Sequence, residues 1–249
     1  MRVVQSAGFL LAQVRELQAG HLFPAAFQRP YVWRADDVEA LWTSVLKGWT
    51  TGSLVLWTPE NGIDVTSVGR TRIGPVTLEP GGDARTLVLD GQNRLATIAW
   101  SLLAPDAERP DLSDASDEER ETWGGDRSLV LDLGTKSVRF VPSDEADTEE
   151  RIPVAVLADN ARMNRIFRNK PDTPATDNFM DWAHTCATSL REARTTFTVL
   201  ERASPAEAFE AFSHVGRAGV PMDPEHMRRS MELLAGMPSK DLHSSMPTL

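Results

Sequence analysis

The run TLVLDGQNRLATIAW at residues 86–100 constrains the fold of this chain more than any other stretch. It opens with apolar residues in the pattern of a short buried strand and closes with apolar residues at helical spacing. A plain connection needs one turn residue and one cap, but five polar or special residues, 90–94, stand between the two. The run therefore predicts a strand, a tight turn and a helix, with extra chemical groups collected at the turn.

Length and composition indicate a globular protein. The 249 residues suit one large domain or two small ones, and 41% hydrophobic with 25% charged residues argues against a disordered or fibrous chain. A single cysteine, Cys186, cannot form an internal disulfide, which favours a reducing compartment. The N-terminus lacks the apolar core of a signal peptide, and no stretch approaches 18 consecutive apolar residues. We therefore expect a cytoplasmic protein that does not enter the membrane.

The net charge of −10 is local rather than general. Residues 105–160 contain 16 acidic and 6 basic residues, whereas residues 1–104 hold 9 of each and residues 161–249 hold 11 of each. The chain is thus a neutral body with an acidic insertion. Such a charge distribution does not exclude nucleic acid as a partner, because one face of the body can still be basic.

Hydrophobic periodicity predicts an α+β fold. Helical spacing is found at residues 9–17, 35–49, 94–104, 160–169, 175–193, 204–215 and 223–236. Strand patterns are found at 53–57, 85–90 and 195–202, with a β-hairpin over 128–141, an extended segment over 21–33, and a solvated loop or weak helix over 105–126. We interpret residues 1–156 as a mixed α/β region with the acidic insertion, and residues 157–249 as a mainly helical region packed on it as one compact unit.

The turn at 90–94 has the components of a phosphate site. Backbone N–H groups at a helix start lack internal partners and attract anions, and Gly91 lets a ligand approach the backbone. Arg94 can bind phosphate oxygens, Asp90 can hold Mg²⁺ or orient a water, and the carboxamides of Gln92 and Asn93 offer donors and acceptors. The alternative is a structural turn in which Asp90 caps the helix and Arg94 pairs with surface acids.

The segment FQRPYVW is a second candidate. It places Gln28 and Arg29 before a rigid proline and two aromatic residues, Tyr31 and Trp33. Arg29 is either a stacked structural residue or a phosphate ligand in a pocket walled by the rings. These residues alone favour neither interpretation.

Three motifs in order carry a family resemblance. They are FQRPYVWRADDVEALWTSVLKGWTTGSLVLW, LVLDGQNRLATIAW and FSHVGRAGVPMDPEHM. Over residues 7–235 the chain resembles the N-terminal domain of GmrSD-type and SspE-type restriction proteins, which typically show QRxYxW, then DGQQRLTTL, then FxRxNxxGxxL. Two positions depart from that pattern. Asn93 replaces the second glutamine and Gly216 replaces the asparagine, flanked here by His214 and Arg217.

The resemblance implies a ParB/sulfiredoxin-like α/β core and a role in prokaryotic defence, in which modified phage DNA is sensed and its cleavage triggered. It implies binding of an NTP, GTP or ATP, with Mg²⁺, and leaves open whether that NTP is hydrolysed. By resemblance, the catalytic residues are Asp90, Gln92 and Arg94, and Asp90 is the metal ligand. The implied nucleotide-binding residues are Gln28, Arg29, Tyr31, Asp90, Gly91, Gln92, Asn93 and Arg94.

Many family members continue into an HNH-type nuclease domain, whose metal site needs clustered histidines. Here His21, His184, His214, His226 and His243 are scattered, and His184 and Cys186 face different sides of their predicted helix. We therefore expect the nuclease to be a separate domain or subunit. The partners implied are DNA, that nuclease and, in a homo-oligomer, further copies of the chain.

Three functions remain open from the sequence. The first is a nucleotide-binding, NTP-hydrolysing regulatory module that senses modified DNA. The second is a non-catalytic DNA-binding or adaptor module, in which the same turn binds DNA phosphate and affinity falls steeply with salt. The third is a ParB-like enzyme that nicks DNA by itself.

Overall fold

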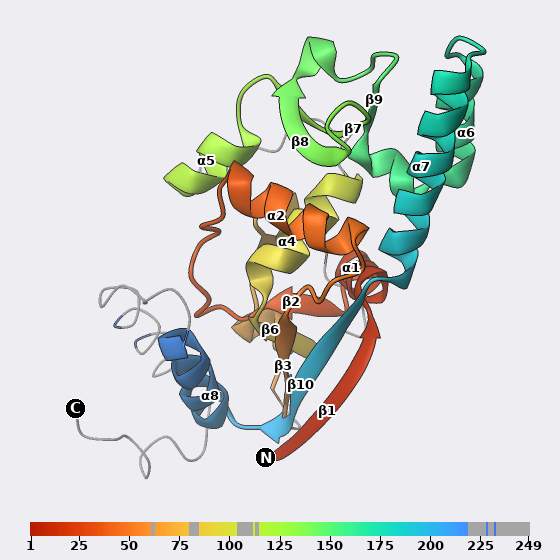
Figure 1. Cartoon of the computed structure of the whole chain (residues 1–249). Helices are drawn as coiled ribbons and strands as arrows, with labels where there is room; N and C mark the ends of the chain where they lie inside the picture. The colour runs from red at the N-terminus through yellow and green to blue at the C-terminus, as the bar shows by residue number, and fades with distance from the viewer. Residues whose placement is uncertain are drawn as a thin grey trace.

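The predicted strand, turn and helix form at the centre of the molecule (Figure 1). The structure is a computed structural model that describes residues 1–60, 63–79, 85–103, 112, 115–218, 228 and 232. Strand β6 (Thr86–Asp90) is followed after Gly91 by helix α4 (Gln92–Leu103). Most of the predicted helix over 223–236, His226, His243 and most of residues 104–114 lie outside the described residues.

β6 belongs to a five-stranded mixed sheet. The strand order is β1 (Arg2–Phe9), β10 (Arg194–Ala203), β3 (Ser53–Pro59), β6, β2 (Leu22–Pro24). β1 is antiparallel to β10 and β3 is antiparallel to β6, whereas the pairs β10 with β3 and β2 with β6 are parallel. β10, from the late part of the chain, therefore lies between two strands from its early part, β1 and β3.

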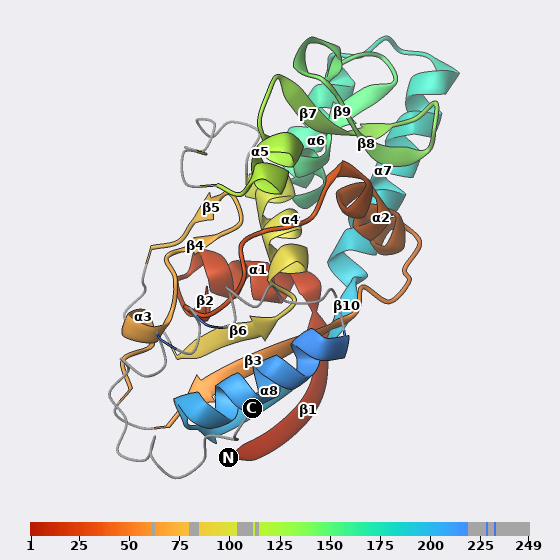
Figure 2. The ribbon, with the colours of Figure 1, turned by 90° about the vertical axis from the view of Figure 1, so that its left-hand side faces the viewer.

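Helices cover both faces of this sheet (Figure 2). α1 (Leu10–Gln18) and α4 lie on one face, with α2 (Ala35–Leu46) beyond them, and α8 (Pro205–Ala218) lies on the other. Trp42 and Trp57 are fully buried, and their indole N–H groups donate to Ser101 Oγ at 3.0 Å and to the Ala203 carbonyl at 2.8 Å. Each large ring thus gains apolar burial without leaving its polar atom unpaired.

A second body of structure sits above α2 and α4. It contains α5 (Asp117–Trp123) and a three-stranded antiparallel sheet in the order β8 (Ser137–Pro142), β7 (Arg127–Asp132), β9 (Arg151–Pro153). Two 3₁₀ turns, η1 (Ser143–Glu145) and η2 (Val154–Ala158), lead to α6 (Asn160–Arg168) and α7 (Pro174–Glu192). Along the chain, β3 and β6 are separated by three short elements, α3 (Val65–Val68), β4 (Arg72–Ile73) and β5 (Val76–Thr77).

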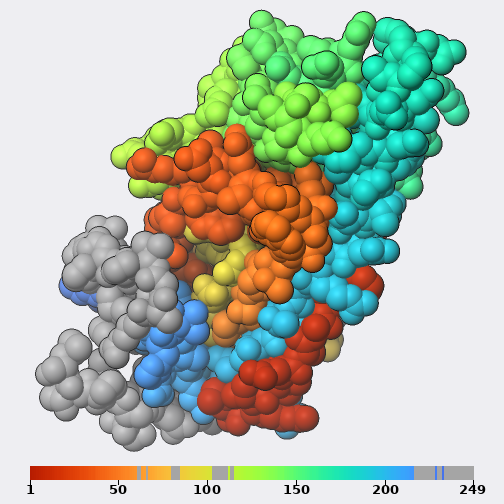
Figure 3. All heavy atoms as spheres, viewed as in Figure 1, coloured from red at the N-terminus to blue at the C-terminus, as the bar shows by residue number. Residues whose placement is uncertain are grey.

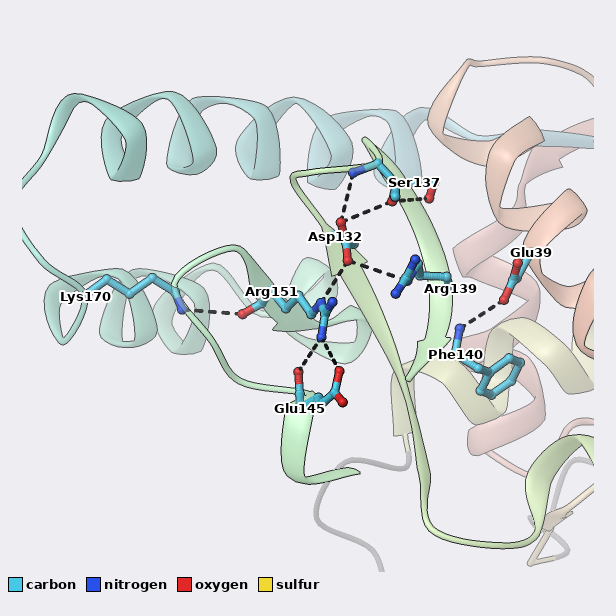
Figure 4. Close-up of polar contacts among 9 residues, drawn as sticks. Glu39, Asp132, Ser137, Arg139, Phe140, Glu145, Arg151 and Lys170 are labelled. Carbon is cyan, nitrogen blue, oxygen red and sulfur yellow. Dashed lines mark hydrogen bonds and ion pairs between the residues drawn. The ribbon is translucent and has the colours of Figure 1, made fainter. Parts of the chain in front are cut away.

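Asp132 joins the strands of this second sheet (Figure 4). Its carboxylate is buried and accepts from the Thr135 backbone N–H at 2.9 Å and from Arg151 Nε at 2.8 Å, with Arg139 Nε at 3.5 Å. Arg151 also donates to Glu145 at 2.8 Å. One acid therefore connects β7, β8 and β9.

The predicted α+β fold is confirmed, and so is the hairpin over 128–141. The N-terminal strand β1 was not predicted, and α2 ends at Leu46, three residues earlier than expected, because Gly48 turns the chain with a φ of +66°. A capping box forms at the start of α8, since the Glu207 carboxylate accepts from the Ser204 N–H at 2.8 Å. In the described part of the chain, no helix has the length and apolar character needed to cross a bilayer.

Candidate functional site

A small hollow lies where β6 passes into α4. It encloses about 70 Å³ and is lined by Gln28, Arg29, Trp33, Asp90, Gly91, Gln92, Asn93 and Arg94. In Figure 3 the beginning of α4, in yellow, is seen in a recess beside the orange segment that precedes and forms α2. The two sequence segments singled out for their chemistry therefore meet at one place, although about 60 residues separate them.

Gly91 determines the shape of the turn. Its φ is +92°, a conformation that residues with a side chain rarely adopt, and a Cβ at this position would lie 2.2 Å from Leu54 Cδ2. The first internal bond of α4 is donated by the Leu95 N–H to the Gly91 carbonyl, at 3.1 Å. The N–H groups of the three residues between, 92–94, have no carbonyl within the helix to bind, so they give this end of α4 a partial positive charge.

Arg94 is held in place by the protein on one side. Its Nη1 donates to the Ser53 carbonyl at 2.5 Å and lies 3.9 Å from Asp90 Oδ2. Gly52 leaves room for the guanidinium, because a Cβ there would lie 2.9 Å from Arg94 Cζ. The Arg94 side chain is only 26% exposed, so it enters the hollow with a fixed position rather than as a free surface arginine.

Two glutamines build the wall of the hollow. Gln28 is buried and donates from Nε2 to the Val88 carbonyl at 2.9 Å, while Gln92 donates from Nε2 to the Arg29 carbonyl at 3.1 Å. The other atom of the Gln92 amide, Oε1, is buried and finds no hydrogen-bond partner among the described residues. A buried acceptor without a partner is costly, so this site is suited to a ligand that donates a hydrogen bond.

Tyr31 lies apart from the hollow. The ring is buried, 1% exposed, and its hydroxyl lies 2.9 Å from Thr97 Oγ1 in the core. Burial raises the pKa of Tyr31 above its usual range, so the phenol stays neutral. Of the two aromatic residues considered as pocket walls, only Trp33 lines the hollow. Tyr31 can be buried in the core because Thr97 gives a hydrogen-bond partner to its hydroxyl, the one polar atom of a large apolar ring.

The chain was compared with known protein families and proteins. A family model described as GmrSD restriction endonuclease, N-terminal domain, matches residues 14–231. The chain belongs to this family. The match includes every residue that lines the hollow in this GmrSD N-terminal domain, and it begins after β1. No curated protein matches the chain. The predicted resemblance is confirmed, and membership links the chain to DNA restriction.

Two other candidates, His214 and Cys186, are not among the residues that line the hollow. His214 is in α8, and the side chain of Arg217 is outside the described set. Cys186 is buried in α7, and burial raises the pKa of its thiol to about 12. Among the residues that the structure describes, no three His, Cys, Asp or Glu side chains are grouped as a metal site.

A larger groove, of about 430 Å³, was not predicted. It is lined by Gln13, Glu16, His21, Leu22, Leu56, Arg85 and Thr86, and His21 Nδ1 lies 3.1 Å from Glu16 Oε2. Both side chains of this pair are about half exposed. The sequence gives no signal for the groove because its lining comes from α1, β2, β3 and β6, which only the tertiary fold brings together.

Proposed function

We propose that the hollow at the start of α4 binds the phosphate end of a nucleoside triphosphate, and that the chain is a nucleotide-dependent sensor module of a restriction system. The observation that carries the proposal is the convergence of Arg29, Arg94 and the N-terminal N–H groups of α4 on one hollow. Arginine forks and the free N–H groups at a helix start are both donors that proteins use for phosphate.

The size of the hollow supports phosphate rather than a whole nucleotide as the part enclosed. Pockets that enclose drug-sized ligands measure roughly 300–1,000 Å³, several times the about 70 Å³ found here. The sugar and base would therefore extend beyond the hollow. Trp33, which lines it and is partly buried, offers an aromatic surface on the way out.

Gln92 supports hydrolysis as well as binding. Its buried Oε1 needs a hydrogen-bond donor, which an ionised phosphate oxygen cannot provide but a water can. The Nε2 bond to the Arg29 carbonyl fixes which end of the amide faces which way. Gln92 would then orient a water beside the phosphate, while Arg29 and Arg94 stabilise negative charge.

The residues present also fit a magnesium ion in part. Proteins usually hold Mg²⁺ through one or two carboxylates together with substrate phosphates, and Asp90 is the single carboxylate among the described residues that line the hollow. Its side chain is 37% exposed and can therefore supply an oxygen ligand. When bound, Mg²⁺ would neutralise phosphate charge. Asn93, 9% exposed, retains the carboxamide of the family pattern on a shorter arm.

Calorimetric titration with ATP and with GTP, each with Mg²⁺, tests the proposal. Wild-type protein should bind one of them, and Arg29→Gln and Asp90→Asn should each weaken binding at least tenfold while the circular dichroism spectrum is unchanged. Arg15→Gln, an exposed arginine on α1, is the matched control and should bind normally. Absence of nucleotide binding by the wild type rejects the proposal. DNA binding lost in Arg29→Gln without nucleotide affinity would instead support the DNA-phosphate function.

A further inference from the structure

α6 is a short helix whose buried side is well defined. Met163 and Phe167 are 0% and 6% exposed, and the Phe167 ring meets Phe179 of α7 edge-on at 5.3 Å. The Asp159 carboxylate caps the helix by accepting from the Arg162 N–H at 3.0 Å. The side opposite Met163 and Phe167 therefore faces away from the core.

The outward side of α6 is basic and carries no acid. Arg162, Arg165 and Arg168 follow one another at intervals of three, which at about 100° per residue keeps them within about 120° of the helix circumference. Arg165 and Arg168 are exposed and make no ion pair with any described residue. No Asp or Glu occurs from residue 160 to residue 171.

The neighbouring basic residue is already used by the fold. Lys170 is only 7% exposed, lies 3.3 Å from Asp147 and donates to the Thr148 carbonyl. It also lies 3.4 Å from the Arg151 carbonyl, the contact drawn in Figure 4. α7, which packs beside α6, exposes Asp177, Asp181 and Glu192. The absence of acid is thus particular to α6 and is not shared by the helix next to it.

Helix stability explains only two of the three arginines. A cation in the last turn is favourable because the carbonyl end of a helix is partly negative, and this accounts for Arg165 and Arg168. Arg162 lies in the first turn, where the same dipole disfavours positive charge. The shared property of the three residues is therefore their common face and not their position along the helix.

We propose that this face of α6 binds the phosphate backbone of duplex DNA. Arginine matches phosphate in charge and in fork geometry, and exposed amides at Asn164 and Asn169 add neutral donors. Contacts of this kind hold and orient DNA without reading its sequence.

The inference rests on the proposed role in restriction but uses a surface separate from the hollow. α6 belongs to the second body with β7 to β9, whereas the hollow lies at the end of α4 nearest the main sheet (Figure 1). Nucleotide binding and DNA binding can therefore be measured independently. The double variant Arg165→Gln with Arg168→Gln removes two charges from α6 and leaves the hollow unchanged.

Fluorescence anisotropy with a labelled 30-base-pair duplex, from 50 to 200 mM salt, tests the proposal. The double variant should bind about 50-fold more weakly at 0.1 M salt, and the slope of log K against log salt should fall by about 1.8, or about 0.9 for each lost phosphate contact. The matched control, Arg15→Gln with Lys136→Gln, removes the same charge from exposed positions elsewhere and should change the slope by less than about 0.5.

Three results would overturn the proposal. They are no binding of the duplex by the wild type at 50 mM salt, an equal loss in the control pair, and an unchanged slope in the double variant. The nucleotide affinity of the same double variant, measured by calorimetry, should equal that of the wild type. Failure of the proposed nucleotide function would therefore be seen separately from failure of DNA binding. Arg165→Lys with Arg168→Lys, which retains charge, should keep most of the affinity. An unchanged circular dichroism spectrum of the Gln double variant excludes misfolding as the cause of its loss.

Discussion

Gly91 is the residue whose backbone the hollow depends on most directly. In Gly91→Ala the left-handed φ of +92° and the approach of the new Cβ to Leu54 act together. We expect the free energy of unfolding to fall by about 3 kcal/mol, from about 1–2 for the backbone and about 1–3 for overpacking. Urea denaturation measures this. Gly125→Ala is the control, because its φ is +74° but nothing lies within 4 Å, and it should lose only about 1 kcal/mol. Equal losses would contradict the role of Leu54.

The buried oxygen of Gln92 gives a second prediction at the scale of the residue. Gln92→Leu removes the unpartnered Oε1 together with the bond to the Arg29 carbonyl, so the free energy of unfolding should change by less than about 1 kcal/mol. If Gln92 orients a water, nucleotide affinity should stay within about threefold and hydrolysis should fall about 100-fold. Phosphate release and calorimetry on the same protein separate the two. Hydrolysis at the wild-type rate in Gln92→Leu would exclude the role.

At this scale the sequence predicted most of the residues that line the hollow but not how each is held. The polar run 90–94 does occupy a strand-to-helix turn, and residues 28 and 29 do reach it. The anchoring of Arg94 on the Ser53 carbonyl and the burial of Tyr31 against Thr97 were not predictable. Both contacts join residues 41 or more positions apart, and neither Ser53 nor Thr97 has a distinctive local pattern.

At the scale of the element, strands were predicted only where one face is buried. β3, β6 and β10 show apolar residues that the core takes up, and all three were found. β1 was missed because six of its eight residues are exposed and the other two only half-buried, so its sequence shows no alternation. It forms because it pairs with β10 along its whole length, from Arg2 with Glu201 to Phe9 with Arg194. This pairing joins strands from distant parts of the chain, so the local sequence pattern of β1 does not predict it.

The three-stranded sheet gives a prediction that depends on pH. Burial alone raises the pKa of Asp132, but hydrogen bonds from the Thr135 backbone and from Arg151, with the charge of Arg139, outweigh it and hold this pKa below its usual value of 3.8. The carboxylate therefore stabilises the fold above that value, and the contribution is lost as the pH falls through the lower folded pKa. Asp132→Asn should cost about 2 kcal/mol at pH 7.

Urea denaturation of wild type and Asp132→Asn between pH 7 and pH 3 measures the effect. The difference between them should be constant down to about pH 5 and should shrink below about pH 4. Glu145→Gln is the control in the same cluster, because the Glu145 side chain is 53% exposed and should leave the urea midpoint nearly unchanged. A difference that does not depend on pH would mean that Asp132 acts through shape and not through charge.

At the scale of the whole molecule, the chain returns to its first sheet after building its second. The sequence indicates a boundary near residue 156, since the pattern becomes mainly helical there. In space, β10 lies between β1 and β3, and the Trp57 indole on β3 donates to the Ala203 carbonyl at the end of β10. Periodicity identifies β10 as a strand but contains no information on its neighbours in the sheet, because pairing depends on contacts between distant segments.

The position of β10 between β1 and β3 predicts that residues 1–156 do not fold alone. Without β10, β1 loses its entire pairing partner and β3 becomes an edge, and the loss of α8 uncovers the apolar face on which Phe27 meets Phe212 at 5.1 Å. The fragment should show little dispersion in its amide NMR spectrum and no cooperative urea transition, whereas the full chain should show one. Co-expression of residues 157–249 should restore the folded spectrum, because the missing strand can pair from a separate chain. A dispersed spectrum from residues 1–156 alone would establish the early region as an independent domain, with β10 and α8 as additions to a sheet that is already stable.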